Sequence, residues 1–232
     1  MTKQGRYLKV VNALGSKIVR GEIRAGSVLP TEDALSEEFA VGRSAVREGM
    51  KMLTSKSLIQ TRTSAGTRVR QRPEWNHMDR DILFWRFSPS GTADDISALA
   101  DLRVAIEPGT ARLAAESADI TARRKVEQAM SRLWATADDP TEFIKADLDF
   151  HRAIFDASAN DFLIYINEVV STAMEQVRPL HTQSTEHNKE TLPNHDRVAV
   201  AIVKGHHRKA EEAMRDIVEV ARHDAMHWRE LT

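Results

Sequence analysis

Three basic residues recur four positions apart in one short segment: Arg43, Arg47 and Lys51. On a helix they would lie along one stripe, and the apolar residues of the segment would lie along another. These apolar residues are Val46, Met50 and Leu53. An arginine can bond both O6 and N7 of guanine in the major groove, whereas a lysine suits the phosphates. The segment therefore predicts a helix that reads bases with Arg43 and Arg47 and contacts the DNA backbone with Lys51.

A second group of residues offers the chemistry of a metal ligand set. Asp147 and His151 are four apart in a helical stretch, so their side chains project from one face about one turn apart. His195 lies in a later helical stretch, in which Val198 and Ile202 take core-facing positions. Two histidines and a carboxylate that point inward suit a divalent metal ion.

The same trio also describes the iron ligands of non-haem oxygenases, so a helical metalloenzyme using Asp147, His151 and His195 is the alternative function. That enzyme site normally lies in a β-rich fold, whereas this half of the chain reads as helix throughout. We therefore expect a regulatory binding protein and not an enzyme. A purely structural helical adaptor is a third alternative, and the paired arginines argue against it.

The N-terminal third supplies the elements that would position the basic helix. Thr31 followed by two acids is a typical helix start. Periodicity and turn residues predict helices at 7–20, 32–39 and 44–55, then strands at 58–62 and 67–70 joined by a turn at Ser64-Ala65-Gly66. This order of elements is that of a winged helix-turn-helix.

The hairpin would act as the wing. Gly66 suits a tight turn, and Arg68, together with Arg70, would approach the DNA backbone or the minor groove. Ser44, at the start of the third helix, and Thr67 complete the expected DNA contacts.

The 232-residue chain has a net charge of −1 that hides an asymmetry. Residues 1–72 contain 14 Lys or Arg against 6 Asp or Glu, a balance of +8, and the other 160 residues contain 19 against 28, a balance of −9. A basic segment joined to an acidic one indicates a polyanion-binding module. The absence of cysteine excludes disulfides, zinc fingers and thiol catalysis. No apolar run reaches the roughly 20 residues that span a bilayer, so we expect a cytoplasmic protein without membrane contact.

Length and turn residues predict two domains joined by a linker. The expected boundaries are 1–72 for the DNA-binding domain, 73–91 for the linker and 92–232 for an all-helical bundle, which makes the fold class mainly α. The linker is rich in aromatic residues, and we expect these to pack between domains or subunits. Breaks between the helices of the bundle are expected at 138–140, at Asn160, at 187–193 and at Gly205.

Residues 21–69 resemble the winged-helix domain of the GntR family of bacterial regulators. The residues that carry the resemblance are Gly21-Glu22-Ile23, Gly26, Leu29-Pro30-Thr31-Glu32, Leu35, Phe39, Val41 to Glu48, Leu53, Leu58-Ile59 and Gly66-Thr67. The resemblance implies that Arg43 and Arg47 read bases and that Gly66 lies in the wing. The chain departs from the pattern at Asp33, where some relatives carry a DNA-contacting arginine, and at Gly49, where alanine is usual. A glycine in a helix costs about 1 kcal/mol of helix propensity.

The rest of the chain is similar to the all-helical effector domain, called FCD, of the FadR-type subgroup. The matching residues are Leu102-Arg103, Ile106-Glu107, Asp147 to His151, Asn160, His195, Ala201-Ile202, Gly205 and Ala210 to Met214. Metal-binding members of the family hold the ion with an aspartate and three histidines, and Asp147, His151 and His195 match the first three of these ligands. The resemblance therefore implies a divalent metal of zinc or nickel type. This chain has Ile217 at the fourth position, and His223 would lie about 120° away around the helix. Either a three-ligand metal site leaves positions open for ligand oxygens, or the trio binds the effector directly.

The resemblance also implies the partners of the chain. Arg103 matches an arginine that faces the effector cavity in the family, and its planar fork suits a carboxylate, so we expect it to bind the effector with His151 and His195. A group of linker residues resembles the linker of the galactonate-operon repressors, which implies a sugar acid such as an aldonate. These residues are Trp75-Asn76, Asp79, Asp81, Leu83 and Trp85. We therefore expect a homodimeric, effector-controlled repressor whose recognition helices bind double-stranded operator DNA.

Overall fold

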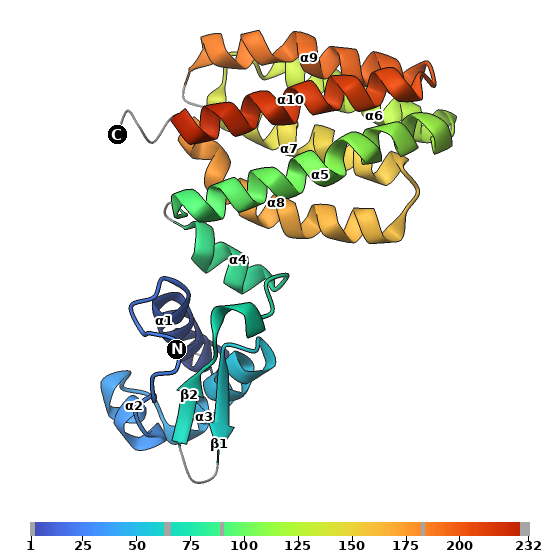
Figure 1. The fold of residues 1–232 in the computed structure, drawn as a ribbon. Helices are drawn as coiled ribbons and strands as arrows, with labels where there is room; N and C mark the ends of the chain where they lie inside the picture. Colours follow the sequence, from blue (N-terminus) through green and yellow to red (C-terminus); the bar gives the residue numbers. More distant parts are fainter. Residues whose placement is uncertain (1–2, 63–65, 89–90, 182–183, 228–232) are drawn as a thin grey trace. The chain divides into compact units, whose positions relative to one another are not determined.

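The chain forms two compact units, residues 1–86 and 87–232, each with a hydrophobic core of its own (Figure 1). The computed structural model describes residues 3–62, 66–88, 91–181 and 184–227. Within these ranges helices dominate, and a single two-stranded sheet supplies the strands. The expected fold class, mainly α, is confirmed.

The first unit has the element order of a winged helix-turn-helix. Its elements are α1 (Lys3–Val19), α2 (Glu32–Glu38), α3 (Arg43–Ser55), β1 (Ile59–Arg62) and β2 (Gly66–Val69). The Thr31 hydroxyl accepts a hydrogen bond from Ala34 N at 3.3 Å, which satisfies one of the N–H groups that a helix start leaves unpaired. The strands are antiparallel, with Ile59 opposite Val69. Apolar side chains from the helices and both strands form one core. Because the apolar side of α3 is buried in this core, the opposite side of the helix faces solvent.

Residues 73–86, expected in the linker, pack within this first unit. The segment contributes η1 (Arg72–Glu74) and α4 (Arg80–Phe87), and the side chains of Ile82 and Trp85 enter the core. The Trp85 ring lies against Gly15 of α1, where an added Cβ would stand 2.3 Å from the ring. The expectation that the linker aromatics pack between domains or subunits is therefore wrong for Trp85, because the absence of a side chain at Gly15 lets its ring lie in the core of one unit.

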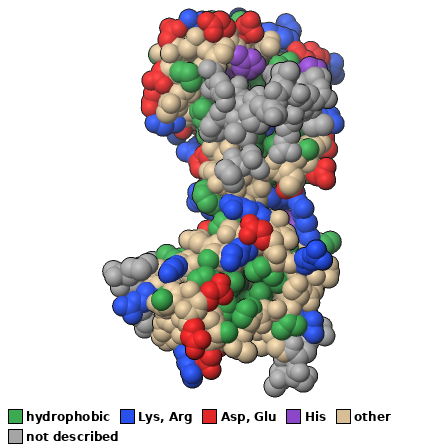
Figure 2. Space-filling view, turned by 90° about the vertical axis from the view of Figure 1, so that its left-hand side faces the viewer, with side chains coloured by type: hydrophobic (Ala, Val, Ile, Leu, Met, Phe, Trp, Pro, Cys, Tyr) green, Lys and Arg blue, Asp and Glu red, His purple; other side chains and the backbone are tan. Residues whose placement is uncertain are grey.

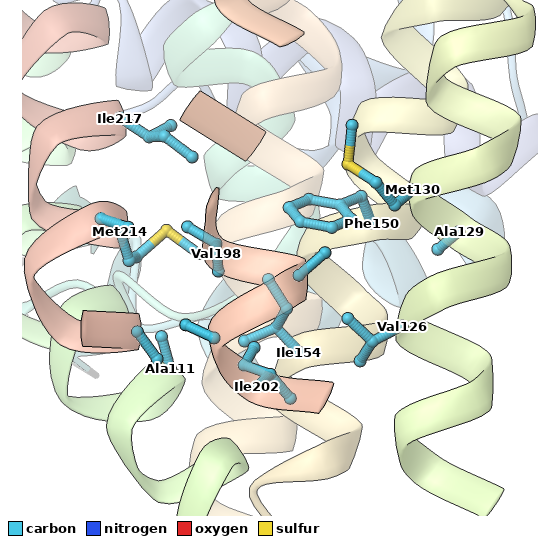
Figure 3. Packing of buried hydrophobic residues seen from close by; sticks show 14 of the residues in the cluster. Ala111, Val126, Ala129, Met130, Phe150, Ile154, Val198, Ile202, Met214 and Ile217 are labelled. Carbon is cyan, nitrogen blue, oxygen red and sulfur yellow. The ribbon is translucent and has the colours of Figure 1, made fainter. Parts of the chain in front are cut away.

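The second unit is a helical bundle. Its helices are α5 (Ala93–Ser117), α6 (Ile120–Ala135), α7 (Pro140–Ala157), α8 (Asp161–His181), α9 (Thr185–Val203) and α10 (His207–His227). Helix α10 packs beside α5 and α9, α6 beside α7 and α9, and α7 also packs on α5 and α8 (Figure 1). Side chains from five of these helices meet in the core, among them Ala111, Val126, Phe150, Val198 and Met214 (Figure 3). None of the described helices is both long and apolar enough to cross a membrane.

Capping residues set where several of these helices begin. Side-chain oxygens accept hydrogen bonds from backbone N–H groups in the first turns of α5, α6, α7 and α9. The capping residues are Thr92, Asp119, Asp139 and Ser184. The expected breaks at 138–140, Asn160 and Gly205 are confirmed.

The break expected at 187–193 is wrong, because α9 runs without interruption through Pro193. A proline inside a helix removes one hydrogen bond and crowds the preceding turn. Here the residues on both sides of it, Leu192 and His195, are buried in the bundle. Their burial keeps the segment helical and places His195 in the interior.

Candidate functional site

Helix α3 presents a basic stripe to the surface. The side chains of Arg43, Arg47 and Lys51 are 72%, 64% and 66% exposed. The residues of the other stripe, Val46 and Leu53 among them, are buried against α1 and the sheet. The stripe of cations is therefore accessible to a large anionic partner, and a helix of this kind fits the major groove of DNA.

Two of these cations have acidic neighbours on α2. Arg43 Nε lies 2.7 Å from Asp33 Oδ1, and Arg47 Nη2 lies 3.2 Å from Glu32 Oε2. Figure 2 shows basic and acidic side chains close to one another on the surface of the first unit. Exposed ion pairs contribute at most about 1 kcal/mol, so an incoming phosphate or base can displace them.

The wing lies in the first unit and is described except for its tip, residues 63–65. Gly66 has φ +71°, in the left-handed region that favours glycine. Thr67 Oγ1 lies 3.2 Å from Thr61 Oγ1 on the paired strand. Arg68 Nη1 donates to Gly26 O at 3.1 Å, so this guanidinium is already held by the chain. The expected turn at 64–66 falls mostly on residues that are not described.

In the second unit, the three residues predicted as metal ligands meet in the interior. Asp147 and His151 lie on α7 and His195 lies on α9, and all three are buried. One candidate ligand atom from each lies within 4.8 Å of the others. His195 Nε2 is 3.1 Å from Asp147 Oδ1, and His151 Nε2 is 3.9 Å from the same oxygen.

Both histidines are oriented as metal ligands are. His195 Nδ1 lies 2.9 Å from Thr191 O, and His151 Nδ1 lies 2.9 Å from Glu107 Oε2. For His195, the acceptor at Nδ1 leaves the lone pair on Nε2, and both rings turn Nε2 toward the carboxylate. Both ring nitrogens of His151 are buried and neither has an aligned hydrogen-bond partner among the described residues, although Nδ1 lies close to Glu107. These donors fit a divalent ion, but Ile217, which lines the same cavity as Asp147 and His195, supplies no fourth donor.

Two ion pairs surround the trio, and the sequence assigned a role to neither Glu107 nor Arg178. Arg103 Nε donates to Glu107 Oε1 at 2.5 Å, and Arg178 Nη1 pairs with Asp147 Oδ2. Arg178 could have been noticed because it lies one turn after Met174, in the buried stripe of α8. A charge at such a position predicts a buried partner.

The ion pairs shift the pKa values of the buried groups. Burial alone would raise the pKa of Glu107, but the Arg103 guanidinium and the His151 ring lower it to about 2. Burial opposes ionisation of Asp147 as well, and Arg178 still holds the pKa of that carboxyl well below its usual range. Burial lowers the pKa of His151 against the opposing effect of Glu107. At neutral pH the carboxylates are therefore charged and His151 is neutral, which are the forms that bind metals.

A cavity of about 90 Å³ adjoins this cluster. Its polar lining includes Arg103, Asp147, Arg178, Asn188, Thr191 and His195, whereas His151 is not among the lining residues. Asn188 Oδ1 is buried and has no hydrogen-bond partner among the described residues. The remaining walls are largely apolar, with Leu99, Phe143 and Ile217. Apolar walls with a few convergent polar groups are typical of a small-molecule site.

Two protein families match the chain, one in each unit. The family of bacterial regulatory proteins called gntR matches residues 6–69, and the FCD domain matches residues 98–220. The first match contains the basic stripe of α3, and the second contains the buried trio and most of the cavity lining.

The chain is also similar to bacterial regulators over most of its length. It is 32% identical to the galactonate operon transcriptional repressor of Escherichia coli K12 over 206 residues, 88% of this chain and 90% of that one. The regulator LutR of Bacillus subtilis is 29% identical over 85% of this chain and 90% of its own. A solved GntR structure from Streptococcus agalactiae shares the fold, with a TM-score of 0.53, 22% identity and coverage of 94% of this chain and 99% of its own.

Proposed function

Because the chain belongs to the GntR family of bacterial regulatory proteins and carries an FCD domain, we propose that it is a repressor whose release from DNA is controlled by a small carboxylic acid. The family is one of transcription regulators, and the related proteins are regulators and not enzymes. This sets aside the metalloenzyme alternative for the trio.

The exposed basic stripe of α3 is the observation that carries the DNA-binding role. Arg43 and Arg47 would read base edges in the major groove, and Lys51 and Ser44 would contact phosphates. The wing would contribute Gly66, Thr67 and Arg68 at the backbone or minor groove. For Arg68 this requires that its guanidinium leave or share its bond to Gly26 O.

The repressor would act as a homodimer on a pseudo-palindromic operator. Two-fold symmetry places two recognition helices in half-sites separated by about one helical turn of DNA. In this arrangement residues 1–72 bind DNA, residues 92–232 bind the effector and the intervening residues connect them. Since its target is chromosomal DNA, we place the protein in the cytoplasm.

The favoured effector is a sugar acid such as an aldonate. The name of the galactonate operon repressor supports this chemistry, because galactonate is a polyol with one carboxylate. Arg103 would bind the carboxylate and share its guanidinium with Glu107. His195 lines the cavity and would bind the hydroxyls, and His151, which does not line the cavity, would assist from beside it. The unpaired Asn188 Oδ1 offers a further acceptor.

A metal ion is a second component that the donor set supports. Asp147, His151 and His195 would hold it, and two imidazoles with a carboxylate suit zinc or nickel. With Ile217 at the fourth position, such an ion would keep coordination positions open. Once bound, it would offer positive charge to the oxygens of a ligand in the cavity.

A gel-shift assay tests the DNA-binding role, with DNA from upstream of the neighbouring genes as probe. The double variant Arg43→Ala, Arg47→Ala should bind the specific site about 30-fold or more weakly, since each base contact contributes roughly 1–3 kcal/mol. Arg132→Ala is the matched control, because Arg132 is an exposed arginine of α6 that pairs with Asp149 in the other unit. If the double variant binds as tightly as the wild type, the recognition helix is misassigned.

A further inference from the structure

We propose that Arg178 is a built-in counter-cation of Asp147 and that its charge weakens the binding of a divalent metal ion at this carboxylate. The proposal rests on the effector site described above, and it concerns the ion rather than the identity of the acid. It predicts that the wild-type site holds a metal only weakly.

The geometry divides the Asp147 carboxylate between two kinds of partner. The two histidine Nε2 atoms face Oδ1, at 3.1 and 3.9 Å, while Arg178 Nη1 contacts Oδ2. Arg178 reaches Asp147 from α8, and the side chains of the pair are 15% and 1% exposed. Water therefore does little to screen the pair, and Arg178 is the main charge that holds the pKa of this carboxyl well below its usual range.

Charge balance explains why a metal would be weakly held. The cluster contains two buried carboxylates, Glu107 and Asp147, and two arginines that pair with them, Arg103 and Arg178. The histidines bring donors but no negative charge. The two arginines already balance the two carboxylates, so a divalent ion would add two uncompensated positive charges. These charges would repel the guanidinium groups strongly at short range in a buried site. Arg178 contacts Oδ2 while the histidines face Oδ1, so its charge would weaken the binding of a metal at Oδ1 without taking its place.

Metal titration of purified, chelator-stripped protein tests the proposal, with zinc and nickel affinities measured by competition against a chromogenic chelator. Arg178→Gln should bind zinc at least tenfold more tightly than the wild type. Arg178→Met, which fills similar space without charge, should behave alike and provides a second variant if the first does not fold. Arg178→Lys keeps the positive charge and should stay near the wild-type affinity.

Arg222→Gln is the matched control. Arg222 also lines the cavity, but its Nη2 pairs with Asp101 at 3.0 Å and not with Asp147, so its loss should change zinc affinity less than twofold. Asp147→Asn placed in the Arg178→Gln chain should abolish the gain. Equal zinc affinity in wild type and Arg178→Gln, or weaker binding by the variant, overturns the proposal. Neither result touches the operator-binding test, which uses no metal.

Discussion

At Arg43 and Arg47, the guanidinium groups that would read bases are held by Asp33 and Glu32. Binding to any DNA must break these pairs. At a specific site, bidentate hydrogen bonds from the arginines to guanine offset the free energy lost with these pairs. Contacts to phosphates alone offset less of it. We therefore expect Asp33, a departure from the family pattern, to lower nonspecific binding without contacting DNA.

We expect Asp33→Asn to bind random-sequence duplex DNA about threefold to tenfold more tightly at low salt, because one negative charge next to the phosphates is lost. Fluorescence anisotropy at two salt concentrations measures this, and the gain should shrink at high salt. Glu142→Gln is the control, since Glu142 pairs with Lys145 on α7 in the other unit. An unchanged affinity for random DNA would show that Asp33 does not restrain Arg43.

Among the elements of the first unit, α1 packs closely on its neighbours at two glycines. An added Cβ on Gly49 of α3 would stand 3.1 Å from Val10 of α1, and one on Gly15 of α1 would stand 2.3 Å from the Trp85 ring. The glycine that costs α3 helix propensity therefore lets the two helices approach each other. Both contacts hold α1 in place, and α1 packs against α3, the helix that carries the basic stripe.

Gly15→Ala should destabilise the first unit by about 1–3 kcal/mol, because the new methyl group must push the Trp85 ring from its place. Calorimetry should show a lower melting temperature for the first unit and no change in the second. Gly109→Ala is the matched control: it lies inside α5 with nothing within 4 Å of the added Cβ, so it should stabilise the second unit by up to about 1 kcal/mol. Equal stability of Gly15→Ala and the wild type would contradict the packing.

The same elements show what could be predicted from the sequence. The stripes of α3 and the Asp147–His151 pair were predictable, because each depends on residues within one helix. The Arg178–Asp147 pair and the Trp85–Gly15 contact were not, because each joins distant parts of the chain. The break expected at 187–193 is wrong for the same reason. Proline disfavours a helix locally, but burial of α9 among distant residues keeps this segment helical. The DNA and effector contacts stay predictions.

On the scale of the whole molecule, regulation requires a free-energy coupling between the two units. The basic stripe lies in the first unit and the cavity in the second, so no residue described here belongs to both sites. Coupling then follows from a shift between states of the protein that differ in affinity for each ligand. Thermodynamics requires the effect to be reciprocal: the factor by which the acid weakens operator binding equals the factor by which the operator weakens acid binding.

Galactonate is the probe for this coupling. At 100 times its dissociation constant it should stabilise the second unit by about 2.7 kcal/mol. That corresponds to a rise of roughly 5–10 °C in melting temperature for a unit of this size. Galactose, which lacks the carboxylate, is the matched control and should leave the melting temperature unchanged, because it offers nothing for Arg103 to bind. Titrations with and without operator DNA should then give the same coupling factor in both directions. If galactonate stabilises the second unit while operator affinity stays constant, the cavity binds the acid but does not regulate DNA binding.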